Sequence, residues 1–257
     1  LVDLAMHVDM FKAHADATPE PHKQYYMNNV SFITDYDVMQ SSDIGSIEVN
    51  DSIHYRNHPI YFKDKLNLRP KILSTNSAIG RGGLYNVQDV ENTYSNFSRL
   101  QYIRYTNIRF YETQLGDTTK LNTYVMLTKN KPKSISFQLD GTNSAGDLGA
   151  AAALSFQHRN LFKGSELFSL RLRGAFEAVS GLQTTYRDDG YTEIGVEASL
   201  NFPRFIFPFL SSDYRKKIRA TTELNIQYNY QFRPEFTRIV ASAGWGYRWG
   251  LKQQYSQ

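Results

Sequence analysis

The chain has 257 residues, with 21% charged and 41% hydrophobic side chains and a formal net charge of +4. This length allows one or two domains, and the basic excess is too small and dispersed to indicate a nucleic-acid partner. No run approaches the roughly 18 apolar residues of a membrane-spanning helix, which excludes a helical membrane protein but not a transmembrane barrel. The absence of cysteine excludes disulfides, thiolate metal sites and cysteine nucleophiles, and the 18 Tyr and 16 Phe favour β-structure.

The N-terminal half mixes strand and helix patterns. Residues 2–10 alternate and are predicted to be the last strand of a preceding unit, and the polar, proline-containing residues 12–23 are predicted to be a linker. Asn50 and Asp51 are predicted to turn a short hairpin within residues 47–55. The remaining elements are strands over 25–34, 100–112 and 121–129, a helix over 68–79, and a helix capped by Asn86. The order strand, helix, helix, strand, strand predicts a small α+β module.

Helical signals disappear after Pro132, and alternating runs follow. In one of them Phe168, Leu170 and Leu172 alternate with Ser169 and Arg171. Because successive side chains of a strand point to opposite faces, each run predicts a strand with one apolar and one polar face. The runs cover residues 134–141, 148–157, 168–177, 192–202, 222–232 and 239–249, which predicts six consecutive antiparallel strands.

A soluble β-sandwich or lipocalin-like barrel alternates in the same way and is the commoner fold. Strand length favours a transmembrane barrel, because a tilted strand needs roughly 9 to 11 residues to cross a bilayer. The lengths of the connections also favour a barrel. Residues 159–165 form a short connection and residues 180–190 a longer one, as expected for periplasmic turns and outer loops. Six strands are fewer than the roughly eight of the smallest bacterial barrels, so the sheet is not expected to close on this chain alone. The chain opens without an initiator Met and stops just after a strand, so both ends are expected to be cut from a longer protein. Aromatic residues near strand ends would form an interfacial girdle: Phe162, Phe202, Phe205, Phe207, Phe209, Tyr230, Phe232, Tyr247 and Trp249.

Three stretches resemble the BamA/TamA outer-membrane assembly family. GGLYNVQDVENTYSNFSRLQYIRYTNIRF (82–110) is similar to the core of its POTRA domain, with Gly83 and Tyr85 before the second helix. LSFQHRNLFKGSELFSLRLRGAFE (154–177) resembles the first periplasmic hairpin of the barrel, and TNSAGDLG (142–149) the first outer loop, especially of the TamA-like lipoprotein branch. The family's Arg-bearing inward loop and a lipid-attachment cysteine are absent from these residues.

The resemblance covers nearly the whole chain and implies a fold. It implies an α+β POTRA module (β-α-α-β-β) followed by the first six antiparallel strands of a transmembrane β-barrel. Residues 1–23 would be the end of a preceding POTRA domain and a linker, 24–131 the POTRA domain, and 132–257 the N-terminal part of the barrel. The implied location is the cell outer membrane, with the POTRA domain in the periplasm.

The resemblance also implies a function, which is assembly and insertion of outer-membrane proteins by strand templating at sheet edges. The barrel edge would be the lateral-seam strand Ser134, Ile135, Ser136, Phe137, Gln138, Leu139, Asp140 and Gly141. The alternative is that this strand pairs permanently with the last strand of the barrel. Clients or accessory proteins would bind the POTRA edge strand Tyr102, Ile103, Arg104, Tyr105, Thr106, Asn107, Ile108, Arg109, Phe110 and Tyr111, although Ile103 and Ile108 could simply pack on the helices. Lipid would contact Phe168, Leu170, Leu172, Phe176, Leu224, Ile226 and Tyr228. The side chains of Arg171, Arg173 and Glu177 would face the lumen.

The partners implied are outer-membrane lipid, unfolded outer-membrane proteins and periplasmic or inner-membrane accessory proteins, with no nucleic acid and no cofactor. Two other functions stay open. One is a two-partner secretion pore that exports a client through the same architecture. The other is a soluble, non-enzymatic β-rich binding protein.

No residue pattern indicates an enzyme or a metal site. Gly80 to Gly83 lack the Gly-Lys-Ser/Thr ending of a phosphate loop, and Asp188-Asp189-Gly190 is typical of a solvated turn rather than a calcium site. Glu193 and Glu197 share a strand face, as in an ordinary polar lumen. The histidines show no helical ligand spacing and are predicted to be surface or packing residues: His7, His14, His22, His54, His58 and His158.

Overall fold

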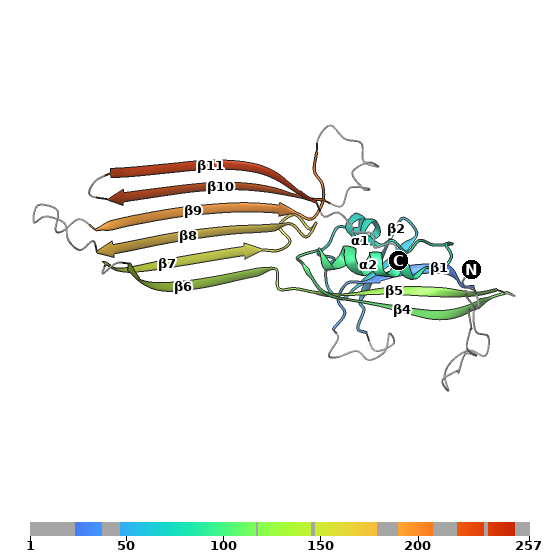
Figure 1. The fold of residues 1–257 in the computed structure, drawn as a ribbon. Coiled ribbons are helices and arrows are strands. Elements are labelled where there is room, and N and C mark those ends of the chain that lie inside the picture. The colour runs from blue at the N-terminus through green and yellow to red at the C-terminus, as the bar shows by residue number, and fades with distance from the viewer. Residues whose placement is uncertain are drawn as a thin grey trace, which may run out of the picture.

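The computed structural model describes residues 24–37, 47–116, 118–144, 147–178, 190–207, 220–233 and 236–249. They form two sheets and two helices (Figure 1). A small α+β module lies at one end of the molecule, and a long six-stranded sheet extends from it. The strand predicted at residues 2–10 and the linker at 12–23 lie outside the described residues. No helix in the described part of the chain is long and apolar enough to cross a membrane.

The module is built on a five-stranded mixed sheet with the order β2-β3-β1-β5-β4. The central strand β1 runs parallel to β3 and β5, whereas β2 pairs antiparallel with β3 and β4 antiparallel with β5. The predicted strands are therefore present, with slightly different ends. The five strands are β1 (Tyr26–Ile33), β2 (Asp51–Tyr55), β3 (His58–Phe62), β4 (Ile103–Leu115) and β5 (Thr118–Lys129).

Two helices, α1 (Pro70–Asn76) and α2 (Val87–Ser98), close the core of the module. Pro70 starts α1, where its missing N–H costs nothing. The Asn86 side chain accepts a hydrogen bond of 2.9 Å from the Gln88 amide and caps α2, as predicted. The two helices and the sheet enclose one apolar cluster, whose fully buried members include Phe32, Ile60, Leu73, Phe97 and Val125.

The predicted hairpin turn at Asn50–Asp51 is wrong. Asp51 starts β2, and the chain turns instead at Arg56 and Asn57, which have φ angles of 48° and 65°. A two-residue turn of type I′ between antiparallel strands needs two left-handed residues, and asparagine tolerates that conformation better than most residues. The hairpin adds β2 and β3 between β1 and the helices, so the predicted order β-α-α-β-β omits two strands.

The second sheet has six antiparallel strands that neighbour one another in sequence order from β6 to β11, as predicted. The register is continuous across all five pairs. The strands β6 and β11 are its two edges, so the sheet is open. Its strands are β6 (Lys133–Ser144), β7 (Asp147–His158), β8 (Leu167–Ala178), β9 (Tyr191–Phe202), β10 (Ala220–Arg233) and β11 (Phe236–Trp249).

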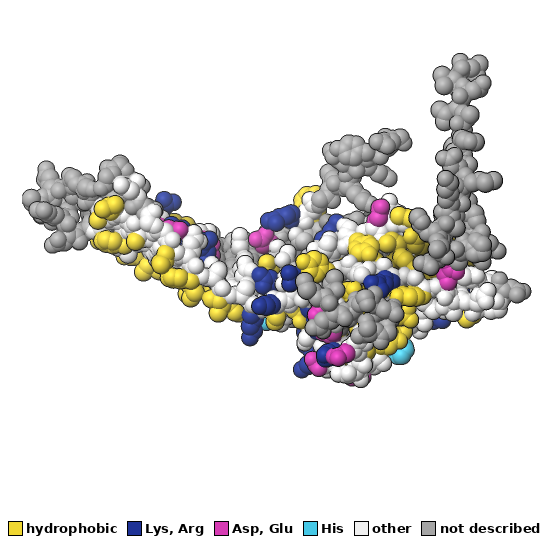
Figure 2. All heavy atoms as spheres, turned by 90° about the horizontal axis from the view of Figure 1, so that it is seen from below, with side chains coloured by type: hydrophobic (Ala, Val, Ile, Leu, Met, Phe, Trp, Pro, Cys, Tyr) yellow, Lys and Arg dark blue, Asp and Glu magenta, His cyan; other side chains and the backbone are white. Residues whose placement is uncertain are grey.

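The register places apolar residues side by side on one face and polar residues on the other. An apolar row crosses the sheet through Ile135, Phe156, Leu170, Ala198, Ile226 and Ala243. A polar row crosses its opposite face through Ser136, Ser155, Arg171, Glu197, Gln227 and Ser242. Figure 2 shows hydrophobic side chains along one side of this sheet and charged ones along the other. A chain that exposes this much apolar surface needs an apolar partner.

Two sequence-based expectations about the connections are wrong. Most of the predicted loop 142–149 is strand, because β6 continues to Ser144 and β7 starts at Asp147, and residues 145 and 146 lie outside the described residues. The connections also do not alternate in length between the two ends of the sheet. The longest one joins β9 to β10 at the same end as the short 159–166 turn, and β10 and β11 are separated by only residues 234 and 235 at the other end.

Candidate functional edges and the turn between them

Strand β6 forms an open edge of the six-stranded sheet and contains the predicted seam residues Ser134 to Gly141. Its only strand partner in the described part of the chain is β7. On its apolar face Ile135, Phe137 and Leu139 are 71%, 65% and 71% exposed. Backbone groups on the outer side of an edge strand are free to pair with another strand.

In the part of the chain that the structure describes, β4 is the long edge strand of the module and contains the predicted residues Ile103 to Tyr111. In the described residues, two segments pair with β1 on the side that faces away from β5. β3 pairs with Phe32 and Ile33, and the segment 82–85 pairs with the start of β1 through Met27 and Tyr26. The outermost strand on that side, β2, has only five residues. The module therefore offers one long edge for strand addition.

Part of the predicted β4 edge is already engaged. The Ile108 amide donates a hydrogen bond of 3.0 Å to the Tyr94 hydroxyl of α2, so it points away from β5. Because amide directions alternate along an antiparallel strand, Thr106 and Phe110 also direct their N–H groups outward, whereas Asn107 and Arg109 face β5. The side chains of Ile103 and Ile108 are buried in the core of the module. This agrees with the alternative that these two residues pack against the helices. Tyr102 precedes β4 and is buried, so it is no part of the free edge.

The turn between β7 and β8, residues 159–166, is held by its own side chains. The Glu166 carboxylate has no exposed surface and accepts hydrogen bonds through Oε2 from the amides of Phe162 (3.2 Å) and Gly164 (2.9 Å). The Asn160 Oδ1 accepts a hydrogen bond of 3.0 Å from the Ser165 amide. Lys163 and Ser165 have φ angles of 59° and 62°, so the backbone is held in a conformation that non-glycine residues rarely adopt.

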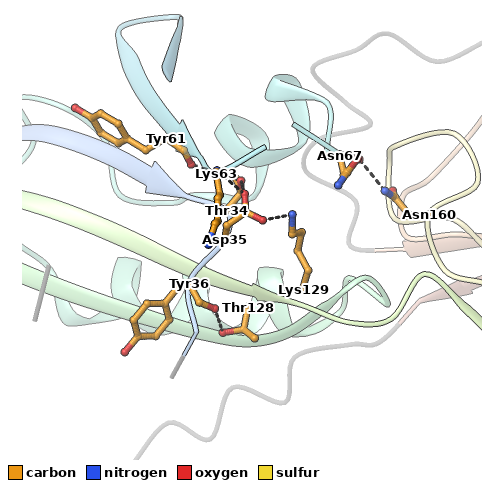
Figure 3. A network of polar contacts seen from close by, with 9 residues as sticks. All are labelled: Thr34, Asp35, Tyr36, Tyr61, Lys63, Asn67, Thr128, Lys129 and Asn160. Atoms are coloured by element: carbon orange, nitrogen blue, oxygen red, sulfur yellow. Dashed lines mark hydrogen bonds and ion pairs between the residues drawn. The ribbon is translucent and has the colours of Figure 1, made fainter. Parts of the chain in front are cut away.

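The same turn contacts the module at three points. The Asn160 side-chain amide donates to the Asn67 carbonyl oxygen over 2.7 Å, a contact seen in Figure 3. The Arg69 amide, just before α1, donates to the Lys163 carbonyl oxygen over 2.8 Å. The Tyr102 amide, just before β4, donates to the Ser165 Oγ over 2.8 Å. The turn also reaches the start of β6, because the Arg159 amide donates to the Pro132 carbonyl oxygen over 2.7 Å.

Polar contacts around the end of β5 stiffen the other side of this junction. Asp35, two residues after the end of β1, forms an ion pair with Lys129 at the end of β5 and accepts a hydrogen bond from the Lys63 amide (Figure 3). The Thr128 hydroxyl donates to the Tyr36 carbonyl oxygen over 2.7 Å. These contacts hold the segment from which β6 starts. Burial, and then the nearby charge of Asp35, raise the pKa of the Tyr102 phenol above its usual value.

The polar face of the six-stranded sheet carries a hollow of about 370 Å³ whose lining includes Arg171, Glu197 and Glu223. Farther along β9, the Glu193 carboxylate accepts hydrogen bonds from Tyr191 (2.7 Å) and Asn229 (2.8 Å). Arg173 and Glu177 share this face through the strand alternation. Glu193 and Glu197 thus belong to a polar wall, as the sequence suggested.

The residues predicted to contact lipid all lie on the apolar face by register. Leu172, Phe176, Ile226 and Tyr228 are exposed, and Phe168, Leu170 and Leu224 are partly buried. Of the predicted aromatic girdle, Phe205, Phe207 and Tyr247 form one cluster, with ring centroids 4.8 Å apart for Phe205 and Tyr247. Their cluster lies at the module end of the apolar face. Phe209 lies outside the described residues.

The described residues contain no group of three metal-ligating side chains. His58 packs edge-on against Phe32 and its Nδ1 lies 3.0 Å from the Val30 carbonyl oxygen, which is a packing role. Gly82 and Gly83 use their backbone groups to bind Met27 rather than a free anion. Asp188 and Asp189 lie outside the described residues, as do His7, His14 and His22.

Sequence reasoning missed the role of the 159–166 turn in joining the two sheets. It identified the turn but not the buried Glu166, nor the contacts of Asn160 and Ser165 with the module. The available signal was the placement of an acidic residue beside Gly164 and Ser165 at the start of an otherwise apolar strand, where a carboxylate can bind the free amides of a turn.

Together the described residues define a class of protein: a small α+β module joined to an open antiparallel sheet with one apolar and one polar face. No family model and no curated protein matches the chain. Among solved structures, BamA from Haemophilus ducreyi lacking POTRA domains 1-3 matches with 11% identity and a TM-score of 0.33, over 81% of this chain and 50% of that one. CdiB from Acinetobacter baumannii matches with 11% identity and a TM-score of 0.41, over 88% of this chain and 43% of that one.

At this identity and at these TM-scores the two matches record a likeness only, and no argument about family or function rests on them. The chain spans half or less of the length of each solved structure.

Proposed function

We propose that this chain is part of an outer-membrane protein assembly factor. In this proposal the six-stranded sheet is the first part of a transmembrane barrel, and the module is a periplasmic POTRA domain. The open edge of β6 templates the strands of unfolded clients. The observation that carries the proposal is an edge strand whose face is apolar and exposed at Ile135, Phe137 and Leu139 and whose opposite face is polar.

A client strand that pairs with β6 satisfies its backbone hydrogen bonds while its apolar side chains enter the lipid. This matters because an unpaired backbone group costs several kcal/mol in the apolar layer. Templating at an edge thus removes the main barrier to insertion, and it needs no covalent chemistry. We propose accordingly that the protein is not an enzyme and that its partners are outer-membrane lipid and unfolded clients.

Site-specific crosslinking tests the edge. A cysteine replaces Ser136 in the cysteine-free chain, and the protein is folded into vesicles with an unfolded eight-stranded client that has one cysteine in its terminal strand. We expect a disulfide between position 136 and the client during assembly. The matched control is Ser199→Cys on β9, which lies on the same polar face but inside the sheet. Equal crosslinking at both positions would contradict templating at β6.

A disulfide that joins position 136 to the final strand of the completed barrel extends this test. Closing the edge in this way should stop client insertion, and reduction should restore it. Normal insertion with the edge closed would also refute the proposal.

A second candidate is a secretion pore of the two-partner kind, favoured by the polar hollow lined by Arg171, Glu197 and Glu223. The two functions leave the client in different places. An assembly factor leaves it folded in the bilayer, where it resists heat in detergent gels. A pore delivers it into the vesicle interior, where added protease cannot reach it. A protein that does not float with the vesicles at all would indicate the soluble binding protein instead.

A further inference from the structure

We propose that the 159–166 turn is a latch that aligns the two open edges, β4 of the module and β6 of the six-stranded sheet. This inference rests on the proposed function and assigns a positioning role to Asn160 and Ser165. The turn belongs to the six-stranded sheet, yet three of its hydrogen bonds end on the module.

The contacts of the latch fall at the first residues of both edges. Ser165 Oγ accepts the Tyr102 amide, and the next residue, Ile103, begins β4. The Arg159 amide donates to the carbonyl oxygen of Pro132, and the next residue, Lys133, begins β6. The Asn130 amide, two residues before Pro132, donates over 2.7 Å to the Tyr102 carbonyl oxygen. One turn therefore fixes where each edge starts relative to the other.

The latch is rigid because its centre is a buried charge. Glu166 is fully buried, and its Oε1 is 3.7 Å from the Arg204 guanidinium, beyond the end of β9. This Oε1 makes no hydrogen bond, so Arg204 and the two turn amides are what compensate the carboxylate. A buried carboxylate is costly unless it is compensated, so the turn resists any movement that would pull it from these groups.

Two substitutions weaken the latch without touching strand pairing. Asn160→Asp keeps the oxygen that accepts the Ser165 amide but replaces the donor to Asn67 with a second oxygen. Ser165→Ala removes the acceptor of the Tyr102 amide. Each lost hydrogen bond should lower the ratio of aligned to misaligned molecules by roughly two- to tenfold.

The readout is the distance between the edges. Spin labels on cysteines at Gln114 of β4 and Ser136 of β6, both exposed, report it in vesicles by pulsed electron paramagnetic resonance. We expect one narrow distance distribution in the unsubstituted protein and a broad one in the Asn160→Asp, Ser165→Ala variant. The matched control, Asn50→Asp with Ser52→Ala, makes the same chemical changes at exposed positions of the module and should leave the distribution narrow.

Client folding is measured on the same variants without labels. The proposal expects the latch variant to slow client insertion while its own barrel keeps its heat resistance. An unchanged distance distribution in the latch variant would overturn the latch, and so would a broadened one with an unchanged insertion rate. If the unsubstituted protein does not accelerate insertion, the proposed function fails. In that case the latch is tested by the distance distributions alone. A broad distribution in the latch variant supports a latch that aligns the edges, and an unchanged distribution refutes it.

Discussion

Replacing Gly164 with alanine should open the 159–166 turn. A Cβ on Gly164 would lie 2.2 Å from Oε1 and 2.8 Å from Cδ of Glu166, which no pair of atoms tolerates without movement. Glu166 is fully buried, so its carboxylate cannot move aside within the turn and has to leave its two amide donors. Hydrogen bonds to a charged acceptor contribute about 1.5–3 kcal/mol each. Allowing for relaxation of the turn, we expect the local opening free energy to fall by about 2–4 kcal/mol.

Hydrogen exchange measures this change directly, because local opening governs how fast buried amides exchange. A loss of this size should accelerate exchange of the Tyr102 and Ser165 amides by roughly 30- to 700-fold. Gly174→Ala is the matched control, since a Cβ there meets nothing within 4 Å. Equal protection of these two amides in both variants would show that Glu166 does not hold the turn.

Three further predictions concern the two faces, the module edge and pH. Ile226→Lys should destabilise the folded protein in vesicles by about 2–4 kcal/mol, whereas Gln227→Lys, one residue away on the polar face, should change the urea midpoint little. Thr106→Pro, whose amide points outward, should reduce client binding to a folded module, but Asn107→Pro should break the β4–β5 ladder and lower the melting temperature. Because the pKa of Tyr102 is raised by burial, the unfolded chain ionises first. Its contribution to stability should be constant below about pH 10 and decline as the pH rises through the folded pKa, and Tyr102→Phe should reduce this decline in urea titrations.

The alternation in the second half of the chain was sufficient to predict its strands. A period of two over ten residues has few other structural solutions, so runs such as Leu224 to Phe232 identify both the strand and its two faces. The Asn86 cap was equally local, because its hydrogen bond needs only Gln88. Both features depend on neighbours in sequence.

The features that sequence reasoning missed depend on residues far apart in the chain. The β2–β3 hairpin turns at Arg56, a residue that rarely adopts a positive φ, so no local signal favoured that turn over Asn50–Asp51. The hydroxyl of Tyr94 occupies the Ile108 amide only because α2 packs beside β4. The bond between Asn160 and Asn67 likewise joins residues 93 positions apart. Such contacts require the fold to be known first.

The segments that pair with β1 affect how many further strands can be added to the sheet of the module. A sheet with two long free edges can bind a chain on each side, and such head-to-tail contacts do not close, so they grow into filaments. In this module the far side ends in the five residues of β2, and segment 82–85 pairs with the start of β1. Within the described residues of the module, β4 is therefore the long edge on which a strand can be added. A sheet with a single long edge can take up one strand-forming chain without extending into a filament.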